Sequence, residues 1–233
     1  MAKVFLSPSN QYDNKYAYGN TTEGVQCGKI AEACKVALER SGIKVKLMHD
    51  ESMQEKCNSS NAFGADLHVC IHTNAFNGKV SGTRMFSYNT NGKGYKACKA
   101  IFSVLAPVTP GTSENIQANP ELYEIRVPAA PTAYIEVDFH DVPNVAKWII
   151  GHTTEIGEKI AEGICNYFNI KYKAKTEDSS KLYRVQVGAF KSKTNAENLL
   201  NKLKAAGFDG YIKESNWLDC VLGVLSNCDI HLP

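Results

Sequence analysis

The amino-acid sequence predicts an α/β protein: an open mixed or mostly parallel sheet flanked by helices, followed by a small C-terminal α/β domain. With 233 residues, the chain is long enough for one domain of roughly 150–180 residues with a buried core and for a second, smaller unit. Segments with strand-like patterns alternate with segments of helical spacing, which is typical of α/β domains. A charged run without apolar periodicity, residues 173–180, has the composition of a linker between the two parts.

Strands and helices alternate through residues 1–172, the predicted larger domain. Strands are expected at 3–6, 45–48, 66–72, 82–87 and 133–139. Helices are expected at 22–41, 52–63, 94–105 and 144–168, and Gly42 and Gly64 follow the first two as stop signals. The segment 107–120 is rich in Pro, Gly and Asn and is expected to be a long loop, of the kind that often carries function.

Residues 181–233 form the second predicted domain, which begins with a βαβ-like pattern. Residues 183–190 alternate like a strand, 194–206 have the spacing of an amphipathic helix, and 210–213 resemble a second strand. This domain is therefore expected to be a small α/β unit.

The composition limits the classes of partner that the chain is expected to bind. Hydrophobic residues make up 43% of the chain and charged residues 21%, which indicates an ordinary globular protein. A formal net charge of +2 is too small to predict binding to nucleic acid or to a membrane surface, and no apolar run approaches the roughly 20 residues that span a bilayer.

Polar residues interrupt the N-terminus, so we expect synthesis in the cytoplasm without a signal peptide. Eight cysteines without a C-x-x-C pair indicate buried reduced thiols.

Side chains suited to catalysis or metal binding lie at three places in the predicted elements. His72 ends a strand, where ligands bind in open α/β sheets, although a histidine there can instead be a hydrogen-bonded structural residue. Glu23 begins the first helix, where an acid can also serve only the helix dipole. Glu136 lies inside a strand, and a carboxylate there needs a metal, a cation or a catalytic role to offset its desolvation. Further polar residues share the same strand faces: His68, Asp138 and His140.

The order of these features resembles a known family. The motifs are Val-Phe-Leu-Ser-Pro at 4–8, Ala-Asp-Leu-His-Val-Cys-Ile-His-Thr-Asn-Ala at 65–75 and Pro-Thr-Ala-Tyr-Ile-Glu-Val-Asp-Phe at 131–139. With Glu23 at the first helix, they resemble the zinc N-acetylmuramoyl-L-alanine amidases of the type-3 class. In that family a first-loop His, the first-helix Glu and the strand-end His hold Zn²⁺, and a later strand Glu is catalytic. The resemblance implies that Glu23 and His72 bind zinc and that Glu136 is catalytic.

The first loop departs from this family. Where the family usually has Asp-Pro-Gly-His-Gly-Gly, the chain has Ser-Pro-Ser-Asn-Gln-Tyr at 7–12, so Asn10 takes the place of the histidine and Gln11 follows it. The resemblance therefore implies either a zinc site completed by the side-chain oxygen of Gln11 or Asn10, which is a weaker ligand than imidazole, or a metal held more loosely than in relatives. The alternative is a non-catalytic peptidoglycan- or glycan-binding protein with a degenerate metal site.

The segment 182–213 also resembles a known family. Its sequence, LYRVQVGAFKSKTNAENLLNKLKAAGFDGYIK, is similar to the sporulation-related repeat or SPOR domain, which binds glycan strands stripped of stem peptides, whereas residues 217–233 depart from that pattern. Together the two resemblances imply a peptidoglycan hydrolase that cleaves the amide bond between N-acetylmuramic acid and L-alanine. The larger domain would bind the stem-peptide amide and the smaller one the glycan. The lack of an export signal favours a phage endolysin that reaches the cell wall through a holin-type route or at lysis.

Overall fold

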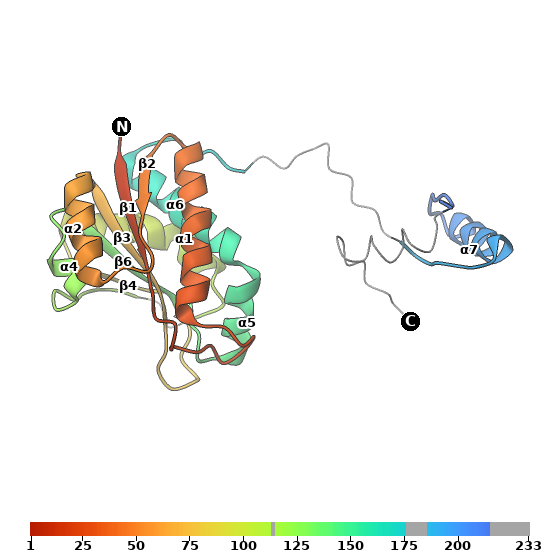
Figure 1. Cartoon of the computed structure of the whole chain (residues 1–233), viewed down its shortest axis with the longest axis horizontal. Coiled ribbons are helices and arrows are strands. Elements are labelled where there is room, and N and C mark those ends of the chain that lie inside the picture. Colours follow the sequence, from red (N-terminus) through yellow and green to blue (C-terminus); the bar gives the residue numbers. More distant parts are fainter. Residues whose placement is uncertain (113–114, 176–185, 215–233) are drawn as a thin grey trace. The chain divides into compact units, whose positions relative to one another are not determined.

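Figure 1 shows the computed structural model of the chain, which describes residues 1–112, 115–175 and 186–214. It consists of two compact units, Met1–Lys175 and Thr176–Pro233. The first unit contains a sheet with helices on both faces, and the described part of the second contains the helix α7 (Lys193–Ala205). Among the described residues, no helix combines the length and the apolar character that crossing a membrane requires.

A six-stranded sheet forms the centre of the first unit, in the order β2-β1-β3-β6-β4-β5. Its strands are β1 (Lys3–Pro8), β2 (Lys44–Leu47), β3 (Leu67–Asn74), β4 (Arg84–Ser87), β5 (Asn115–Ala118) and β6 (Thr132–Phe139). The strands β2, β1, β3 and β6 are parallel neighbours, β4 runs antiparallel to β6, and β5 is parallel to β4. The sheet is therefore mixed and mostly parallel, which confirms the predicted fold class.

The strand β5 corrects the expectation that 107–120 is loop throughout. Its four residues, Asn-Ile-Gln-Ala, lack an alternating pattern and are only partly buried or exposed, because they pair with β4 at the edge of the sheet. Pairing with a distant segment produces this strand, and local sequence patterns do not report such pairing.

Helices cover both faces of the sheet (Figure 1). They are α1 (Glu23–Arg40), α2 (Met53–Phe63), α3 (Lys93–Leu105), α4 (Tyr123–Arg126), α5 (Pro143–Gly151) and α6 (Thr153–Phe168), and a 3₁₀ turn at Ala106–Val108 follows α3. The helix α6 packs against both α1 and α3, and the three helices close the main hydrophobic core with Leu6, Ile71 and Ile135 of the strands. The helices α2 and α4 contact each other on the opposite face.

The two faces of the sheet differ in chemistry because side chains alternate along each strand. On β3, Val69 and Ile71 enter the main core, whereas His68 and Cys70 point to the face that α2 and α4 cover. Burial of Ile71 alone contributes about 1.5–3 kcal/mol to the free energy of unfolding. The apolar face thus stabilises the fold, and the opposite face carries buried polar groups.

Two local signals explain where α2 begins and ends. Ser52 accepts a hydrogen bond from the Glu55 backbone amide, and the Glu55 carboxylate accepts one in return from the Ser52 amide, which forms a capping box. Gly64 follows the helix with φ 64° and ψ 50°, a left-handed conformation that glycine adopts without steric cost.

The single helix expected at 144–168 is two helices, α5 and α6, which corrects the prediction. The break falls at His152, where φ is −124° and ψ is 17°. The His152 ring stacks on Trp148 at 4.8 Å between ring centroids, and its Nδ1 pairs with the Trp148 carbonyl. Both helices present apolar residues to the core, such as Ile149 and Ile156, so hydrophobic periodicity continues through the break and hides it.

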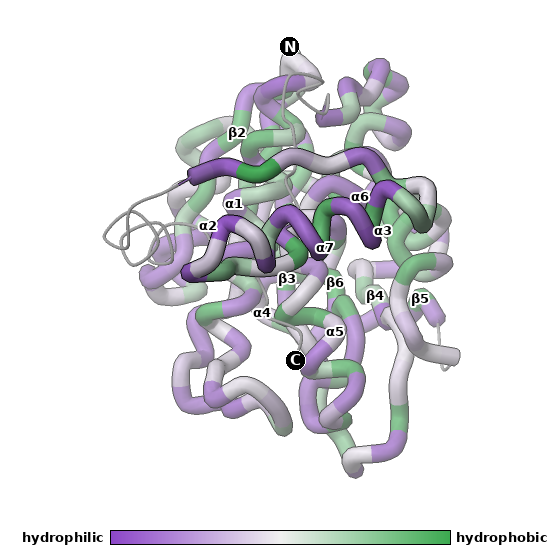
Figure 2. Tube along the Cα trace, turned by 90° about the vertical axis from the view of Figure 1, so that its right-hand side faces the viewer, coloured by the Kyte–Doolittle hydropathy of each residue, from purple (hydrophilic) through white to green (hydrophobic). Residues whose placement is uncertain are grey.

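In the second unit, the predicted helix is present as α7, but the two predicted strands are absent from the described residues 186–190 and 210–213. Residues 183–185 and the atypical tail 217–233 lie outside the described part. The helix buries none of its residues and is largely hydrophilic (Figure 2), while Val187, Phe190 and Tyr211 are exposed. Strands need a partner and a buried face, and the described part of this unit supplies neither.

The packing of α6 against α3 yields a stability prediction. A Cβ added at Gly163 would lie 2.4 Å from the Cα of Ile101, which is backbone and cannot rotate away. We expect Gly163→Ala to lower the free energy of unfolding by about 1–3 kcal/mol, through overpacking. Gly151→Ala is the matched control, because a Cβ there meets nothing within 4 Å. Urea denaturation measures both, and equal midpoints for the two variants would contradict the argument.

Candidate functional site

The candidate site lies at the carboxyl ends of the adjacent strands β3 and β6, where ligands bind in open α/β sheets. In the parallel register of these strands, His72 is directly opposite Glu136. The first loop and the N-terminus of α1 border the same edge, since Ser9 donates its backbone amide to the carbonyl of Ile71. The sheet therefore brings together two of the three residues that the sequence singles out.

The third residue, Glu23, is held against His72. Its Oε1 lies 2.8 Å from Nδ1 of His72, and its Oε2 accepts a 2.6 Å hydrogen bond from the side-chain amide of Asn14. Both members of the pair are buried, with exposed fractions of 1% for Glu23 and 9% for His72. The stacked ring of Tyr134, 4.7 Å away between centroids, fixes the plane of the imidazole.

The electrostatics of this pair favour its charged form. Burial raises the pKa of Glu23, but the hydrogen bonds from His72, Ser9 and Asn14, together with the charge of His72, lower it below its usual value overall. For His72, burial lowers the pKa, but the hydrogen bond to Glu23 and the charges of Glu136 and Glu23 raise it overall. The carboxylate and the imidazole therefore stabilise each other.

Glu136 has a different environment. Some of its surface is exposed, yet enough protein surrounds the carboxyl group that burial raises its pKa to about 7, against the lowering effect of His72. Its Oε2 is buried without a hydrogen-bond partner among the described residues. A carboxyl group with a pKa near neutrality can both accept and release a proton at physiological pH, which is what general acid–base catalysis requires.

A hydrogen-bond network behind Glu23 holds the first loop in place. Oδ1 of Asn14 pairs with Nε2 of His140 at 3.3 Å, and Nδ1 of His140 pairs with the hydroxyl of Thr73 at 2.9 Å. The same hydroxyl pairs with Tyr16, whose ring stacks on His140 at 4.8 Å between centroids. Asn14 therefore links Glu23 to a rigid, buried group of side chains.

Among the described residues, neither of the two amides expected to complete a metal site is hydrogen-bonded to Glu23 or His72. The amide nitrogen of Asn10 donates to the carbonyl of Glu51 at 3.0 Å, and Gln11 is exposed. Asn14 is the amide of the first loop that contacts Glu23. Asn14 lies outside the motif that resembles the family, and local sequence patterns do not predict the fold of an irregular loop, so the sequence alone does not point to this residue.

The remaining polar residues of the strand faces have separate surroundings. Asp138 accepts hydrogen bonds from the backbone amides of Gly82 and Phe139, both at 2.7 Å, which indicates a structural role in the turn before β4. His68 lies four residues before His72 on β3 and pairs with Glu124 of α4 at 3.3 Å. His140, by contrast, belongs to the network behind Glu23.

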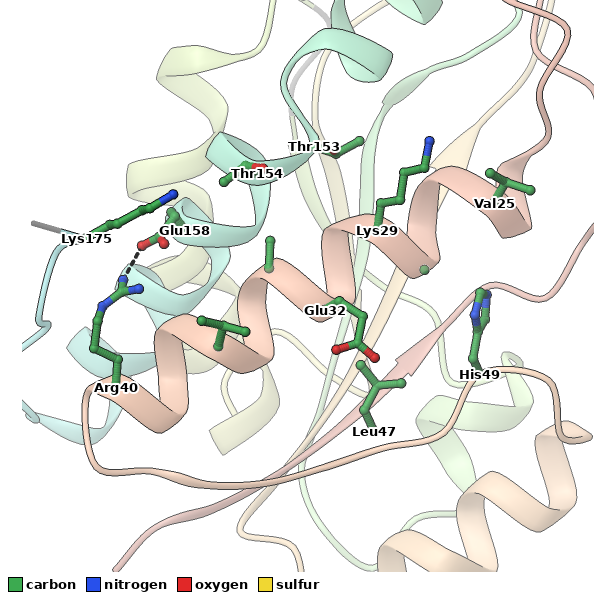
Figure 3. A pocket seen from close by; sticks show the side chains of 13 residues that line it. Val25, Lys29, Glu32, Arg40, Leu47, His49, Thr153, Thr154, Glu158 and Lys175 are labelled. Atoms are coloured by element: carbon green, nitrogen blue, oxygen red, sulfur yellow. Dashed lines mark hydrogen bonds and ion pairs between the residues drawn. The ribbon is translucent and has the colours of Figure 1, made fainter. Parts of the chain in front are cut away.

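A groove of about 700 Å³ runs along the outer face of α1 (Figure 3). Its lining includes Val25, Lys29, Glu32, Leu47, His49 and Thr154. Within it, Arg40 forms a 2.5 Å ion pair with Glu158. Glu23, His72 and Glu136 are not part of this lining, so the chemistry is assigned to the edge of β3 and β6.

Comparison with known families accounts for both parts of the chain. Residues 4–166 match the family model described as N-acetylmuramoyl-L-alanine amidase. Residues 165–214 match the SPOR domain model, which includes α7 and its flanking segments.

Individual relatives agree with these matches. A sporulation-specific N-acetylmuramoyl-L-alanine amidase of Bacillus subtilis (strain 168) is 26% identical over 219 residues, covering 91% of this chain and 84% of that protein. The N-acetylmuramoyl-L-alanine amidase CwlM of Bacillus licheniformis is 25% identical over 224 residues, covering 91% and 85%. The solved catalytic domain of CwlV, an amidase from Bacillus (Paenibacillus) polymyxa var. colistinus, superposes with a TM-score of 0.64 and 17% identity, covering 73% of this chain and 100% of that one. That structural likeness shows a shared fold.

The raised pKa of Glu136 predicts a pH dependence of stability in metal-free protein. Its pKa of about 7 in the folded state exceeds the roughly 4.3 of an exposed glutamate, so the folded state binds more protons between these values. The contribution of Glu136 to the free energy of unfolding therefore falls as pH rises through this window. We expect Glu136→Gln, which does not titrate, to reduce that fall. Urea denaturation of the chelator-treated parent and variant at about pH 5 and about pH 8 gives the free energy of unfolding at each pH. The prediction is contradicted if the difference between the two pH values is the same in Glu136→Gln as in the parent.

Proposed function

Because the chain belongs to the N-acetylmuramoyl-L-alanine amidase family, we propose that it cleaves peptidoglycan with Glu136 as the proton carrier and a zinc ion held by Glu23 and His72. The bond cleaved is the amide between N-acetylmuramic acid and L-alanine. The observation that carries this proposal is the position of Glu136, whose carboxyl group has a pKa of about 7 and lies opposite His72 in the sheet.

The residues present fit a zinc ion. A buried carboxylate oxygen and an imidazole nitrogen are ligands that zinc accepts readily. Oε1 of Glu23 and Nδ1 of His72, the atoms that would bind the metal, lie 2.8 Å apart. Bound zinc would polarise the scissile carbonyl and lower the pKa of a water molecule towards about 7.

Glu136 supplies the proton chemistry. Its carboxylate accepts a proton from the attacking water, and the resulting carboxylic acid then donates that proton to the nitrogen of the leaving L-alanine. The free Oε2 and the raised pKa support both steps, because burial makes the carboxyl group a better proton acceptor than an exposed glutamate. A glutamate with an ordinary pKa would be a poorer acid in the second step.

Three amides of the first loop compete for the role of third protein ligand. The family resemblance favours Asn10 or Gln11, whereas hydrogen bonding favours Asn14, which already contacts Glu23 and is anchored by His140. Rotation of the amide group of Asn14 would turn its oxygen from His140 towards a cation without moving the loop, and its amide nitrogen would then face Nε2 of His140. We therefore propose Asn14 as the amide that completes the site or orients Glu23 within it.

The second domain directs the enzyme to the cell wall. The SPOR match supports binding of peptidoglycan, and we propose that its target is glycan stripped of stem peptides, which is the product of the amidase reaction. We propose domain limits of 1–172 for catalysis, 173–180 for the linker and 181–233 for wall binding. The retained group of Glu23, His72 and Glu136 argues against the alternative of a binding protein without catalysis.

Replacement of Glu136 tests the mechanism. We expect Glu136→Gln to lower the rate of release of L-alanine amino groups from purified peptidoglycan by about 10²-fold or more, with bound zinc retained, because the amide cannot carry the proton. Glu121→Gln is the matched control, since Glu121 is exposed and outside the site. Activity within a few-fold of the parent in folded Glu136→Gln would remove Glu136 from the reaction.

Metal analysis of variants tests the zinc site separately. We expect His72→Ala and Glu23→Ala to lose bound zinc, and Asn14→Ala to weaken zinc binding by about 10–100-fold, as measured by competition with a chelator. Asn10→Ala and Gln11→Ala are matched controls, because each removes an amide of the same loop that does not contact Glu23. A loss of affinity in Gln11→Ala with Asn14→Ala unchanged would favour the ligand set implied by the family resemblance.

A further inference from the structure

A second group of metal-binding side chains lies on the same face of the sheet, away from the carboxyl edge. One nitrogen of His68, the thiol sulfur of Cys70 and a carboxylate oxygen of Glu124 all lie within 4.8 Å of one another. Their exposed fractions are 0%, 0% and 4%. We propose that these three residues bind a second cation of the zinc class, separate from the ion proposed for Glu23 and His72.

Hydrogen bonding within the protein leaves this group incompletely satisfied. Oε1 of Glu124 takes up a hydrogen bond from Ser7 at 2.5 Å and pairs with Nε2 of His68 at 3.3 Å. Nδ1 of His68, however, is buried without a partner among the described residues. A buried ring nitrogen without a partner costs free energy, so a role in hydrogen bonding alone explains the group only in part.

The donor atoms match the preferences of zinc. Imidazole nitrogen, thiolate sulfur and carboxylate oxygen are its usual protein ligands, and three of them leave a position for a fourth. Cys57 of α2 lies outside this group of three, but it is fully buried and close enough to interact electrostatically with Cys70, and a shift of its side chain would bring it to that position. Two thiolates and the Glu124 carboxylate would also balance the charges of a divalent cation and of Lys56, which is buried nearby and donates to the carbonyl of Pro8 at 2.8 Å.

This second site is distinct in position and in role. His68 is four residues before His72, about 13 Å along the strand, and the two sites share no ligand. Its ligands join β3 to α4, a four-residue helix in the segment that leads to β6 and Glu136. A cation here would tie that segment to the sheet, which is a structural role beyond the proposed reaction.

Cobalt provides a direct readout, because thiolate-bound Co²⁺ has a charge-transfer absorption that a site of oxygen and nitrogen ligands lacks. The full chain is stripped with a chelator and titrated with Co²⁺. We expect two ions per chain and a thiolate band, both in the parent and in a Cys220→Ser/Cys228→Ser variant, which removes the thiols outside the described residues. No thiolate band at saturating Co²⁺, or a band lost in that variant, would overturn the proposal.

Single substitutions separate the two sites. We expect Cys70→Ser to lose the band and one ion, while Cys34→Ser keeps both, because Cys34 is an equally buried thiol in the main core. His72→Ala should keep the band and lose the other ion, so failure of the zinc site at Glu23 leaves this test unaffected. Retention of the band in Cys70→Ser would contradict the proposal, and if that variant does not fold, the parent titration decides alone.

Discussion

The parallel pairing of β3 with β6 is the constraint on which the rest of the site depends. It aligns His72 with Glu136 although 63 residues separate them in the chain, because it joins two segments that are far apart in the sequence. Parallel pairing also places the carboxyl ends of both strands at one edge, and the first loop reaches that edge through the amide of Ser9. The distance and relative orientation of the catalytic groups thus follow from the sheet itself, whose hydrogen bonds are rigid compared with those of a loop.

That rigidity is possible because the two faces of the sheet have different roles: one stabilises the fold, and the other contains the polar groups. The face against α1, α3 and α6 is apolar and closely packed, with Gly157 and Gly163 of α6 permitting backbone contact with α1 and α3. The opposite face contains buried acids, imidazoles and thiols, which cost free energy to desolvate. The stabilisation gained on the first face offsets that cost and holds Glu136 in surroundings that raise its pKa to about 7.

Much of this arrangement could be predicted from the sequence. The alternation of strands and helices was sufficient for the fold class. Local position marked Glu23, His72 and Glu136 as candidates, but only the family resemblance assigned Glu23 and His72 to a metal and Glu136 to catalysis. Local patterns did not reveal β5, because an edge strand depends on its partner strand. They also did not reveal the break at His152, because the hydrophobic period continues across it. In the second unit, the strand patterns are real in sequence, but the described residues give them no buried face.

The first loop shows why side-chain identity alone does not assign a metal ligand. Alignment by position favours Asn10, whose amide nitrogen donates to the carbonyl of Glu51, whereas the amide that contacts Glu23 belongs to Asn14. An amide oxygen is a weaker zinc ligand than imidazole, so it gains most from being held in place before the metal binds. The link from Asn14 to His140 supplies that restraint, because the stacked and hydrogen-bonded imidazole cannot turn without breaking its contacts with Thr73 and Tyr16. An amide oxygen that is already held in position loses less conformational freedom when it binds zinc, and this offsets part of its weakness as a ligand relative to imidazole.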